Sequence, residues 1–273
     1  MLPTALTAHL RALRPGGHAA CARRCILALI TVAGATTLAS SSVLAQPTPG
    51  SAAPFKAVGN EPNWTLDVGA GRLLLLTDEG RTRTLLPLPP PTRLEGGRRY
   101  DARNDAHTLS VTILDRVCAD TMTGMPRPAT VEVTLDGRLL KGCGGDSTAL
   151  LRGGPWAVET IRDRPLVFLE AKKNKTPVRT SITMTFDAAG RLWGTTSCNT
   201  FTATYVLSGE GLTITMPIAS ARPCQSQVMS QEAALLETLR GVVRFEIAAD
   251  GALVLVASEG GTITARRQTQ AGQ

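Results

Sequence analysis

Apolar and polar residues alternate along most of this chain, and the alternation is the feature that most constrains its fold. Trp64, Leu66 and Val68 are separated by polar residues, and the pattern recurs at 108–114 and 181–186. Turn-forming pairs such as Asp-Gly follow several of these segments. A period of two is typical of strands with one buried face, and Asp-Gly between two such runs indicates a tight hairpin. The sequence therefore predicts a mainly β protein.

One segment, 229–239 (MSQEAALLETL), breaks this alternation and predicts an amphipathic helix. The residues that form its apolar stripe are Val228, Leu235, Leu236 and Leu239. Glu232 falls on or near this stripe, where a carboxylate is costly unless donors surround it. We expect backbone amides or Arg222 to satisfy Glu232, which gives this residue a structural role.

The first 45 residues have the pattern of a secretory signal peptide. Arginines that include Arg23 and Arg24 precede an apolar run at 25–39, and small residues lead to Ala45. Cleavage after Ala45 is expected to give a periplasmic or secreted protein, by the general route or by the twin-arginine route. Because the run is shorter than the about 20 residues of a spanning helix, no transmembrane segment is expected in the mature chain.

Cleavage would also change the charge of the protein. It removes four arginines and no acid, so the formal charge falls from +7 to +3. No long basic stripe with interleaved aromatic residues remains, and nucleic-acid binding is not expected. The one remaining histidine, His107, has no G-x-S-x-G sequence or free cysteine to accompany it. We therefore expect no catalytic residue, metal or cofactor.

Four cysteines remain after cleavage, and an even number in an oxidising compartment predicts disulfides. Cys118 and Cys143 are 25 residues apart, while Cys198 and Cys224 are 26 apart. One bridge in each half is the simplest pairing. Neither pair forms a Cys-x-x-Cys sequence, which argues against a redox or zinc site.

Breaks in the pattern divide the mature chain into two predicted domains. Residues 46–54 are expected to form a flexible leader. Residues 55–145 are expected to form an all-β domain. A glycine-rich linker at 146–154 leads to a second domain at 155–267, and 268–273 form a frayed tail. A monomer is expected.

The second domain carries a Cys-Asn loop at 194–205, a second cysteine loop at 216–224 and then the helix. The motif positions are Cys198, Asn199, Phe201, Tyr205, Cys224 and Glu232. Their order resembles the META/HslJ domain of bacterial envelope proteins, which implies a curled antiparallel sheet or open barrel packed on one helix. The chain has Ser197, Thr200 and Ala203 where that family usually has Gly, Arg and Gly. Asn199 tolerates a left-handed backbone and bonds neighbouring amides, so we expect it to organise the loop.

The first domain has its own motif residues: Gly59, Asn60, Glu61, Pro62, Trp64, Cys118, Asp120, Met122, Gly124, Gly142 and Cys143. They resemble a domain seen fused ahead of META domains, for which no activity is known. Tryptophans such as Trp64 and Trp193 lie in or before strands and are expected in the core or at a barrel rim.

The META resemblance implies a role in envelope maintenance or stress tolerance. We expect a binding protein rather than an enzyme, with an envelope protein or a lipid as its partner. One alternative is a lipid-binding or pilot-like chaperone. Another is an inhibitor of an enzyme such as lysozyme, with the loop at 121–128 as a plug. The least favoured is a hydrolase with paired carboxylates, Asp115 with Asp120 or Glu61 with Asp67.

Overall fold

The computed structural model describes residues 54–167, 181–209 and 211–268. The predicted signal peptide, nearly all of the predicted leader and the end of the tail lie outside these ranges, as does the lysine-rich segment at 172–175, for which the sequence predicts a turn. Within the described ranges, no helix combines the length and the apolar character that crossing a bilayer requires.

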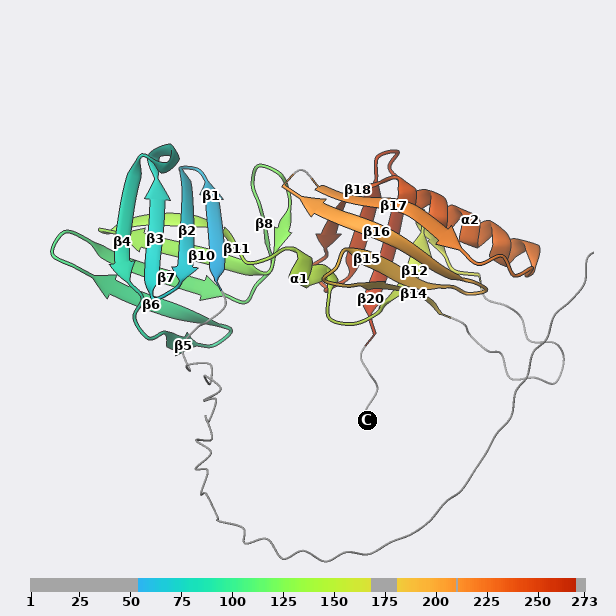
Figure 1. The fold of residues 1–273 in the computed structure, drawn as a ribbon, viewed down its shortest axis with the longest axis horizontal. Helices are drawn as coiled ribbons and strands as arrows, with labels where there is room; N and C mark the ends of the chain where they lie inside the picture. The colour runs from blue at the N-terminus through green and yellow to red at the C-terminus, as the bar shows by residue number, and fades with distance from the viewer. Residues whose placement is uncertain (1–53, 168–180, 210, 269–273) are drawn as a thin grey trace, which may run out of the picture. The chain divides into compact units, whose positions relative to one another are not determined.

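The first sheet contains nine antiparallel strands in the order β4-β3-β2-β1-β11-β10-β7-β6-β5 (Figure 1). The strands are β1 (Phe55–Asn60), β2 (Asn63–Gly69), β3 (Arg72–Thr77), β4 (Thr82–Pro87), β5 (Thr92–Leu94), β6 (Gly97–Arg103), β7 (Thr108–Leu114), β10 (Ala129–Leu135) and β11 (Arg138–Gly144). A 3-10 turn, η1 (Asp78–Gly80), joins β3 to β4. The short strands β8 (Cys118–Ala119) and β9 (Pro126–Arg127) pair with each other. Because β1 pairs with β11, the first and last strands of this half lie side by side.

The alternation that predicted these strands corresponds to burial in the structure. In β7, Leu109, Val111 and Ile113 are fully buried, while the residues between them face outward. They pack with Trp64 and Leu75 in one hydrophobic core. The sheet therefore curls around a single apolar face, as a half-buried antiparallel sheet does.

The second sheet has the strand order β17-β16-β15-β14-β12-β20-β19-β18, with β13 paired to β12. Its strands are β12 (Trp156–Ile161), β13 (Arg164–Pro165), β14 (Ile182–Phe186), β15 (Arg191–Thr196), β16 (Thr200–Ser208), β17 (Gly211–Ala219), β18 (Val242–Ile247), β19 (Leu253–Ala257) and β20 (Thr262–Arg267). The end strands β17 and β18 approach each other, so the sheet is a nearly closed barrel (Figure 1). Gly211 permits this approach, since a Cβ there would overlap the carbonyl oxygen of Val243.

The long helix α2 (Ser226–Arg240) lies along this second sheet (Figure 1). Val228, Leu235 and Leu239 are fully buried, as the apolar stripe predicted. The helix begins slightly before residue 229, its predicted start. A mainly β fold with a curled sheet and one long helix in the second half is thereby confirmed.

The predicted linker contains a short helix, α1 (Thr148–Leu151). Leu151 is fully buried in the second core, and its carbonyl oxygen accepts a 2.7 Å hydrogen bond from Trp156 Nε1. Arg267 donates to the carbonyl oxygens of Leu150 and Arg152. Residues 148–151 thus pack with the second sheet, and the proposed division into two domains remains a prediction.

Candidate functional site

The META motif residues meet in a buried polar cluster, which we call the Asn199–Glu232 network. Asn199 is 3% exposed between β15 and β16, and Glu232 is 7% exposed on α2. Asn199 Nδ2 donates to Glu232 Oε1 at 3.2 Å, and Thr196 Oγ1 donates to Glu232 Oε2. Both carboxylate oxygens therefore have donors, as a buried carboxylate requires.

Asn199 also holds the loop that follows β17. Its Oδ1 accepts from the backbone N–H of Arg222 and from Ser220 Oγ, each at 2.9 Å. The Cys198–Cys224 pair joins the same two loops, with Cα atoms 6.4 Å apart. The disulfide and the Asn199 amide together fix the geometry of this end of the sheet.

Two details of this region differ from the expectations. The two cysteine loops are shorter than predicted, because β16 begins at Thr200 and β17 continues to Ala219. Arg222 reaches the network through its backbone, while the shorter side chains of Thr196 and Asn199 provide the donors for Glu232.

The left-handed residue of the loop is Ser197, with φ 76°, and not Asn199. Ser197 stands where the family usually has glycine, which adopts this conformation without steric cost. The backbone of this loop thus explains that family preference, and Asn199 organises the loop through its side chain.

Phe201 and Tyr205 belong to the core of the second sheet. They are 1% and 6% exposed. The Tyr205 ring packs edge-on against Phe186 at 5.2 Å, and its hydroxyl donates to the carbonyl oxygen of Asp187. Burial raises the pKa of Tyr205. These two motif residues therefore serve packing.

The motif residues of the first sheet gather around Trp64. This side chain is 1% exposed, and its Nε1 donates to the carbonyl oxygen of Lys141 at 3.3 Å. Gly59 and Gly142 lie against the indole, and a Cβ at either position would overlap it. The Glu61–Pro62 peptide is cis and lies in the turn between β1 and β2.

Asp120 organises the turn between β8 and β9. Its Oδ1 accepts from the backbone N–H groups of Met122 at 3.0 Å and Thr123 at 2.9 Å, and from Asn60 Nδ2 at 3.2 Å. Gly124, at φ 72°, closes the turn by donating to the carbonyl oxygen of Asp120. Burial alone would raise the pKa of Asp120, but these donors outweigh it and hold the pKa below its usual value. Beside this turn, Cys118 and Cys143 have Cα atoms 5.5 Å apart, at disulfide distance.

The Asp120→Asn variant tests this account of the turn. At pH 7 we expect a loss of about 1 to 3 kcal/mol in unfolding free energy, because an amide is a weaker acceptor for these donors and for Thr123 Oγ1, which also bonds Asp120. A carboxyl with a lowered pKa stabilises the fold above its usual pKa of 3.8, and that stability is lost as the pH falls below it. Urea unfolding at pH 7 and pH 3 should show the two proteins converging at the lower pH. A difference that stays constant with pH would contradict the role of the carboxylate.

Three of the carboxylates considered for hydrolysis have defined neighbours in the structure. Asp67 forms an ion pair with Lys56 at 3.2 Å. Glu61 instead borders a hollow of about 320 Å³ together with Asp120 and Lys141. Because the pKa of Asp120 is lowered, this residue is a poor general acid at neutral pH. In the loop at 121–128, Met125 and Pro126 are buried.

Other titratable groups give no stronger candidate. His107 Nδ1 lies 2.8 Å from Asp136 Oδ2 at the surface. The backbone N–H of Thr108, followed by the His107 ring, holds the pKa of Asp136 below its usual value. Among the residues that the structure describes, no three His, Cys, Asp or Glu side chains are grouped to hold a metal ion.

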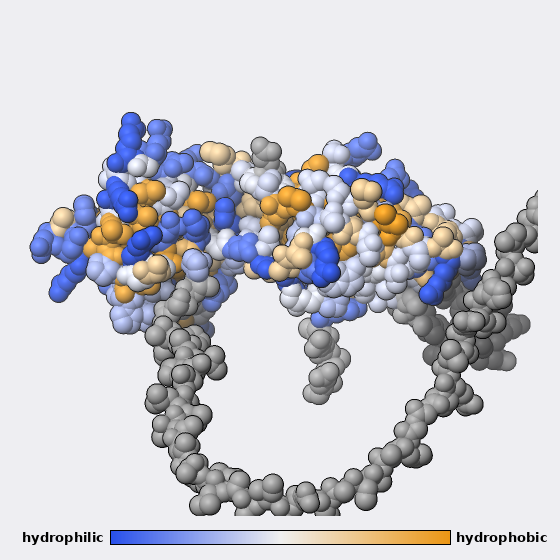
Figure 2. All heavy atoms as spheres, in the orientation of Figure 1, coloured by the Kyte–Doolittle hydropathy of each residue, from blue (hydrophilic) through white to orange (hydrophobic). Residues whose placement is uncertain are grey.

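The second sheet carries an open hollow of about 550 Å³ on its outer face, which we call the apolar groove. Its lining residues are Arg191, Leu192, Trp193, Thr202, Ala203, Thr204, Thr215, Met216 and Ile218. Trp193 and Ile218 flank Thr202 across β15, β16 and β17. Trp193 is 40% exposed, Ile218 62% and Met216 75%. Figure 2 shows apolar and near-neutral residues reaching the surface over β16 and β17.

The groove could not be predicted from strict alternation. That pattern would place Met216 inside with Leu212 and Ile214. Instead, the pairing of β16 with β17 shifts register between Thr202 and Thr204, and Met216 has φ 51°. Such an irregularity re-aims side chains, so Met216 turns outward beside Thr215. The apolar-rich run at 212–216 directly before Pro217 was the only signal available.

The second half of the chain thus has the architecture of a small β-barrel with a packed helix. The model of the META domain family matches residues 149–270, so this half is a META domain, as its motifs predicted. This family is associated with the bacterial envelope and is not a known enzyme family. The family match begins at residue 149, and the resemblance proposed for the first half stays a prediction.

Solved structures are also similar to part of this chain. An NMR structure of a protein from Burkholderia xenovorans is 22% identical, with 45% of this chain and 88% of that chain covered and a TM-score of 0.35. A crystal structure of a DUF4847 family protein from Bacteroides vulgatus is 15% identical, covers 46% and 99% of the two chains, and has a TM-score of 0.32. No curated protein matches the chain.

Proposed function

We propose that this protein acts in the bacterial envelope as a binding protein rather than as an enzyme, and that the apolar groove holds its partner. The observation that carries this proposal is the joint exposure of Trp193, Met216 and Ile218 on one sheet face. Contiguous exposed apolar side chains with a polar surround are typical of interaction sites.

The free energy available in the groove supports binding. Complete burial of one large apolar side chain stabilises a complex by about 1.5 to 3 kcal/mol. The left-handed backbone at Met216 costs about 1 to 3 kcal/mol, and strain of this kind is found mainly at functional sites. A partner that covers Met216 and Ile218 would bury two such apolar side chains.

The partner that we propose is an apolar segment of another envelope protein. The groove is open and follows β16, with Thr202 and Thr204 in its floor. The hydroxyls of Thr204 and Thr215 lie 2.6 Å apart and form a hydrogen bond with each other. A ligand therefore needs few polar groups to bind over them. An open groove of this kind suits side chains of an extended peptide, which favours the pilot-like chaperone among the alternatives.

Separate observations support a location in the envelope. The two cysteine pairs are at disulfide distance, which fits an oxidising compartment outside the cytoplasm. The signal-peptide pattern at residues 1–45 and the META domain agree with this location. Envelope maintenance or stress tolerance is the role that we propose there.

A double variant, Met216→Asn with Ile218→Thr, tests the groove. Both side chains are exposed, so we expect an unfolding free energy within about 0.5 kcal/mol of the wild type. In a strain that lacks the gene, the variant should fail to restore growth in detergent. Val206→Thr is the matched control, because Val206 is 63% exposed on β16 but does not line the groove. Full restoration by the double variant would exclude the groove as the functional surface.

A further inference from the structure

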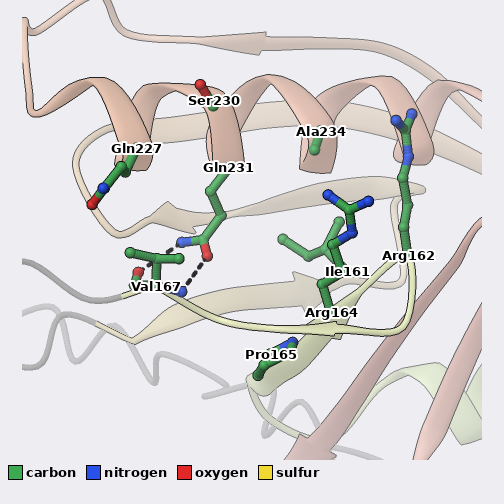
Figure 3. Close-up of a pocket in the computed structure, with 9 residues that line it drawn as sticks. All are labelled: Ile161, Arg162, Arg164, Pro165, Val167, Gln227, Ser230, Gln231 and Ala234. Carbon is green, nitrogen blue, oxygen red and sulfur yellow. Dashed lines mark hydrogen bonds between the residues drawn. The ribbon is translucent and has the colours of Figure 1, made fainter.

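A second hollow, separate from the apolar groove, lies between α2 and the hairpin of β12 and β13. We call it the arginine pocket, and its volume is about 350 Å³ (Figure 3). The residues that line it are Ile161, Arg162, Arg164, Pro165, Val167, Gln227, Ser230, Gln231 and Ala234. A volume of this size falls at the lower end of the range for small-molecule sites.

Hydrogen bonds hold the two walls of the pocket together. Gln231 reaches from α2 to the opposite wall, where Oε1 accepts from the backbone N–H of Val167 at 2.6 Å (Figure 3). Its Nε2 donates to the carbonyl oxygen of Val167 at 3.0 Å. Arg162 Nε donates to Thr238 Oγ1 at 3.1 Å, which ties the hairpin to the helix at a second point. The walls of the pocket are therefore held by the protein's own side chains.

The turn that presents the arginines is strained. Arg162 and Asp163 have φ values of 53° and 59°, the arrangement of a type I′ hairpin turn. That turn normally selects Asn or Gly, and each left-handed non-glycine residue costs about 1 to 3 kcal/mol. Asp163 Oδ1 accepts from Thr262 Oγ1 at 2.8 Å, which helps to hold the turn.

The pocket has an unbalanced positive charge. Arg162 is paired with Glu237 at 2.9 Å. Arg164 forms no ion pair and no side-chain hydrogen bond with another residue in the described ranges. Its guanidinium points into the space between Ile161 and α2 (Figure 3). No carboxylate is among the lining residues, so one cationic group is available to a ligand.

Polar and apolar residues surround Arg164 in about equal parts. Ile161 is 5% exposed and forms the floor, and Pro165, Val167 and Ala234 contribute carbon surface. One planar guanidinium matches a carboxylate, whereas a phosphate usually gathers several charged donors. The chemistry of the pocket thus selects a single negative charge next to a small apolar group.

We propose that the arginine pocket binds a carboxylate carried beside a short apolar group. Arg164 pairs with the carboxylate, and Ile161 and Ala234 contact the apolar group. Two sources share this chemistry: the C-terminus of a peptide that ends in an apolar residue, and a free short-chain acid. This site does not depend on the apolar groove or on its partner.

Titrations with N-acetyl-leucine and N-acetyl-leucinamide, followed by amide NMR spectra of the whole mature protein, test the charge requirement. We expect signal shifts confined to residues 161–167 and 227–234, with the acid binding about tenfold or more tighter than the neutral amide. Binding of the acid should weaken as salt is added. Equal binding of both probes, or shifts spread over the molecule, would overturn the proposal.

Two further probes distinguish the sources of the ligand. N-acetyl-Ala-Ala-Leu tests the peptide C-terminus, and hexanoate tests the free acid. Tighter binding of the peptide assigns the pocket to protein C-termini, and tighter binding of hexanoate assigns it to short-chain acids. If neither binds, the proposed site is wrong.

Variants of the pocket complete the test. Arg164→Gln should weaken the binding of N-acetyl-leucine about tenfold, and Ala234→Leu should block it by filling the pocket. Arg93→Gln, on β5 of the first sheet, is the matched control and should bind as the wild type does. Amide spectra of each free variant show whether it is folded. Unchanged binding by a folded Arg164→Gln protein would contradict the site.

Discussion

Replacing Cys198 and Cys224 together by serine is expected to lower the unfolding free energy of the META domain by about 3.5 kcal/mol. The bond closes a segment with a sequence separation of 26, and cross-linking it reduces the entropy of the unfolded chain by about that amount. The two loops held by the disulfide also carry Asn199, so part of its network should weaken. Urea unfolding of the oxidised wild type and of the variant measures the difference.

The matching change at Cys118 and Cys143 is the control. The Cys118–Cys143 bond closes a segment of nearly equal length in the first half, with a sequence separation of 25. We expect a similar loss of about 3.5 kcal/mol, but in the unfolding of the first sheet. Non-reducing peptide mapping of exported protein should recover these two pairings. Free thiols, or a bond between the two halves, would contradict the assignment.

Glu232→Ala is expected to destabilise the META domain by about 3 kcal/mol, because buried donors that lose a charged acceptor retain their full desolvation cost. Thr196 Oγ1 and Asn199 Nδ2 lose this charged acceptor and keep only longer bonds to the carbonyl oxygens of Asn199 and Arg222. Glu232→Gln keeps one acceptor oxygen and should lose about half as much. Urea unfolding at neutral pH measures both variants.

Glu237→Ala on the same helix is the matched control for this change. Glu237 pairs with Arg162 at the surface, where an ion pair contributes about 1 kcal/mol or less. If Glu232→Ala and Glu237→Ala unfold alike, the network contributes little to the fold. A stable Glu232→Ala protein that has lost its activity in cells would make Glu232 a functional residue.

Much of the strand pattern could be predicted from the sequence because burial alternates along each strand. The segment at 108–114 is a strand with the same bounds in the structure, β7. The stripe of Val228, Leu235 and Leu239 defined α2 and its buried face. These features depend on local periodicity, which a sequence displays directly.

The candidate sites depended on features that periodicity does not contain. The outward turn of Met216 results from a register shift, which strict alternation cannot anticipate. The cysteine loops are short because β16 and β17 extend into segments that had been assigned to loops. Arg164 and Gln231 are far apart in sequence, and only the packing of α2 against β13 brings them to one pocket. The hydrogen-bond partners of buried polar groups could not be predicted either. Thr196, which donates to Glu232, was not among the expected donors.

The central claim is that the motif residues of the META domain build the fold, whereas binding takes place on the open outer face. The melting temperature of the Asn199→Ala protein tests it most directly. Loss of the bonds to Glu232, Arg222 and Ser220 should cost about 2 kcal/mol and lower the melting temperature by about 5 to 10 °C. Activity in cells should then fall only as far as the folded fraction does. A variant that melts at the wild-type temperature but fails to restore growth in detergent would contradict the claim.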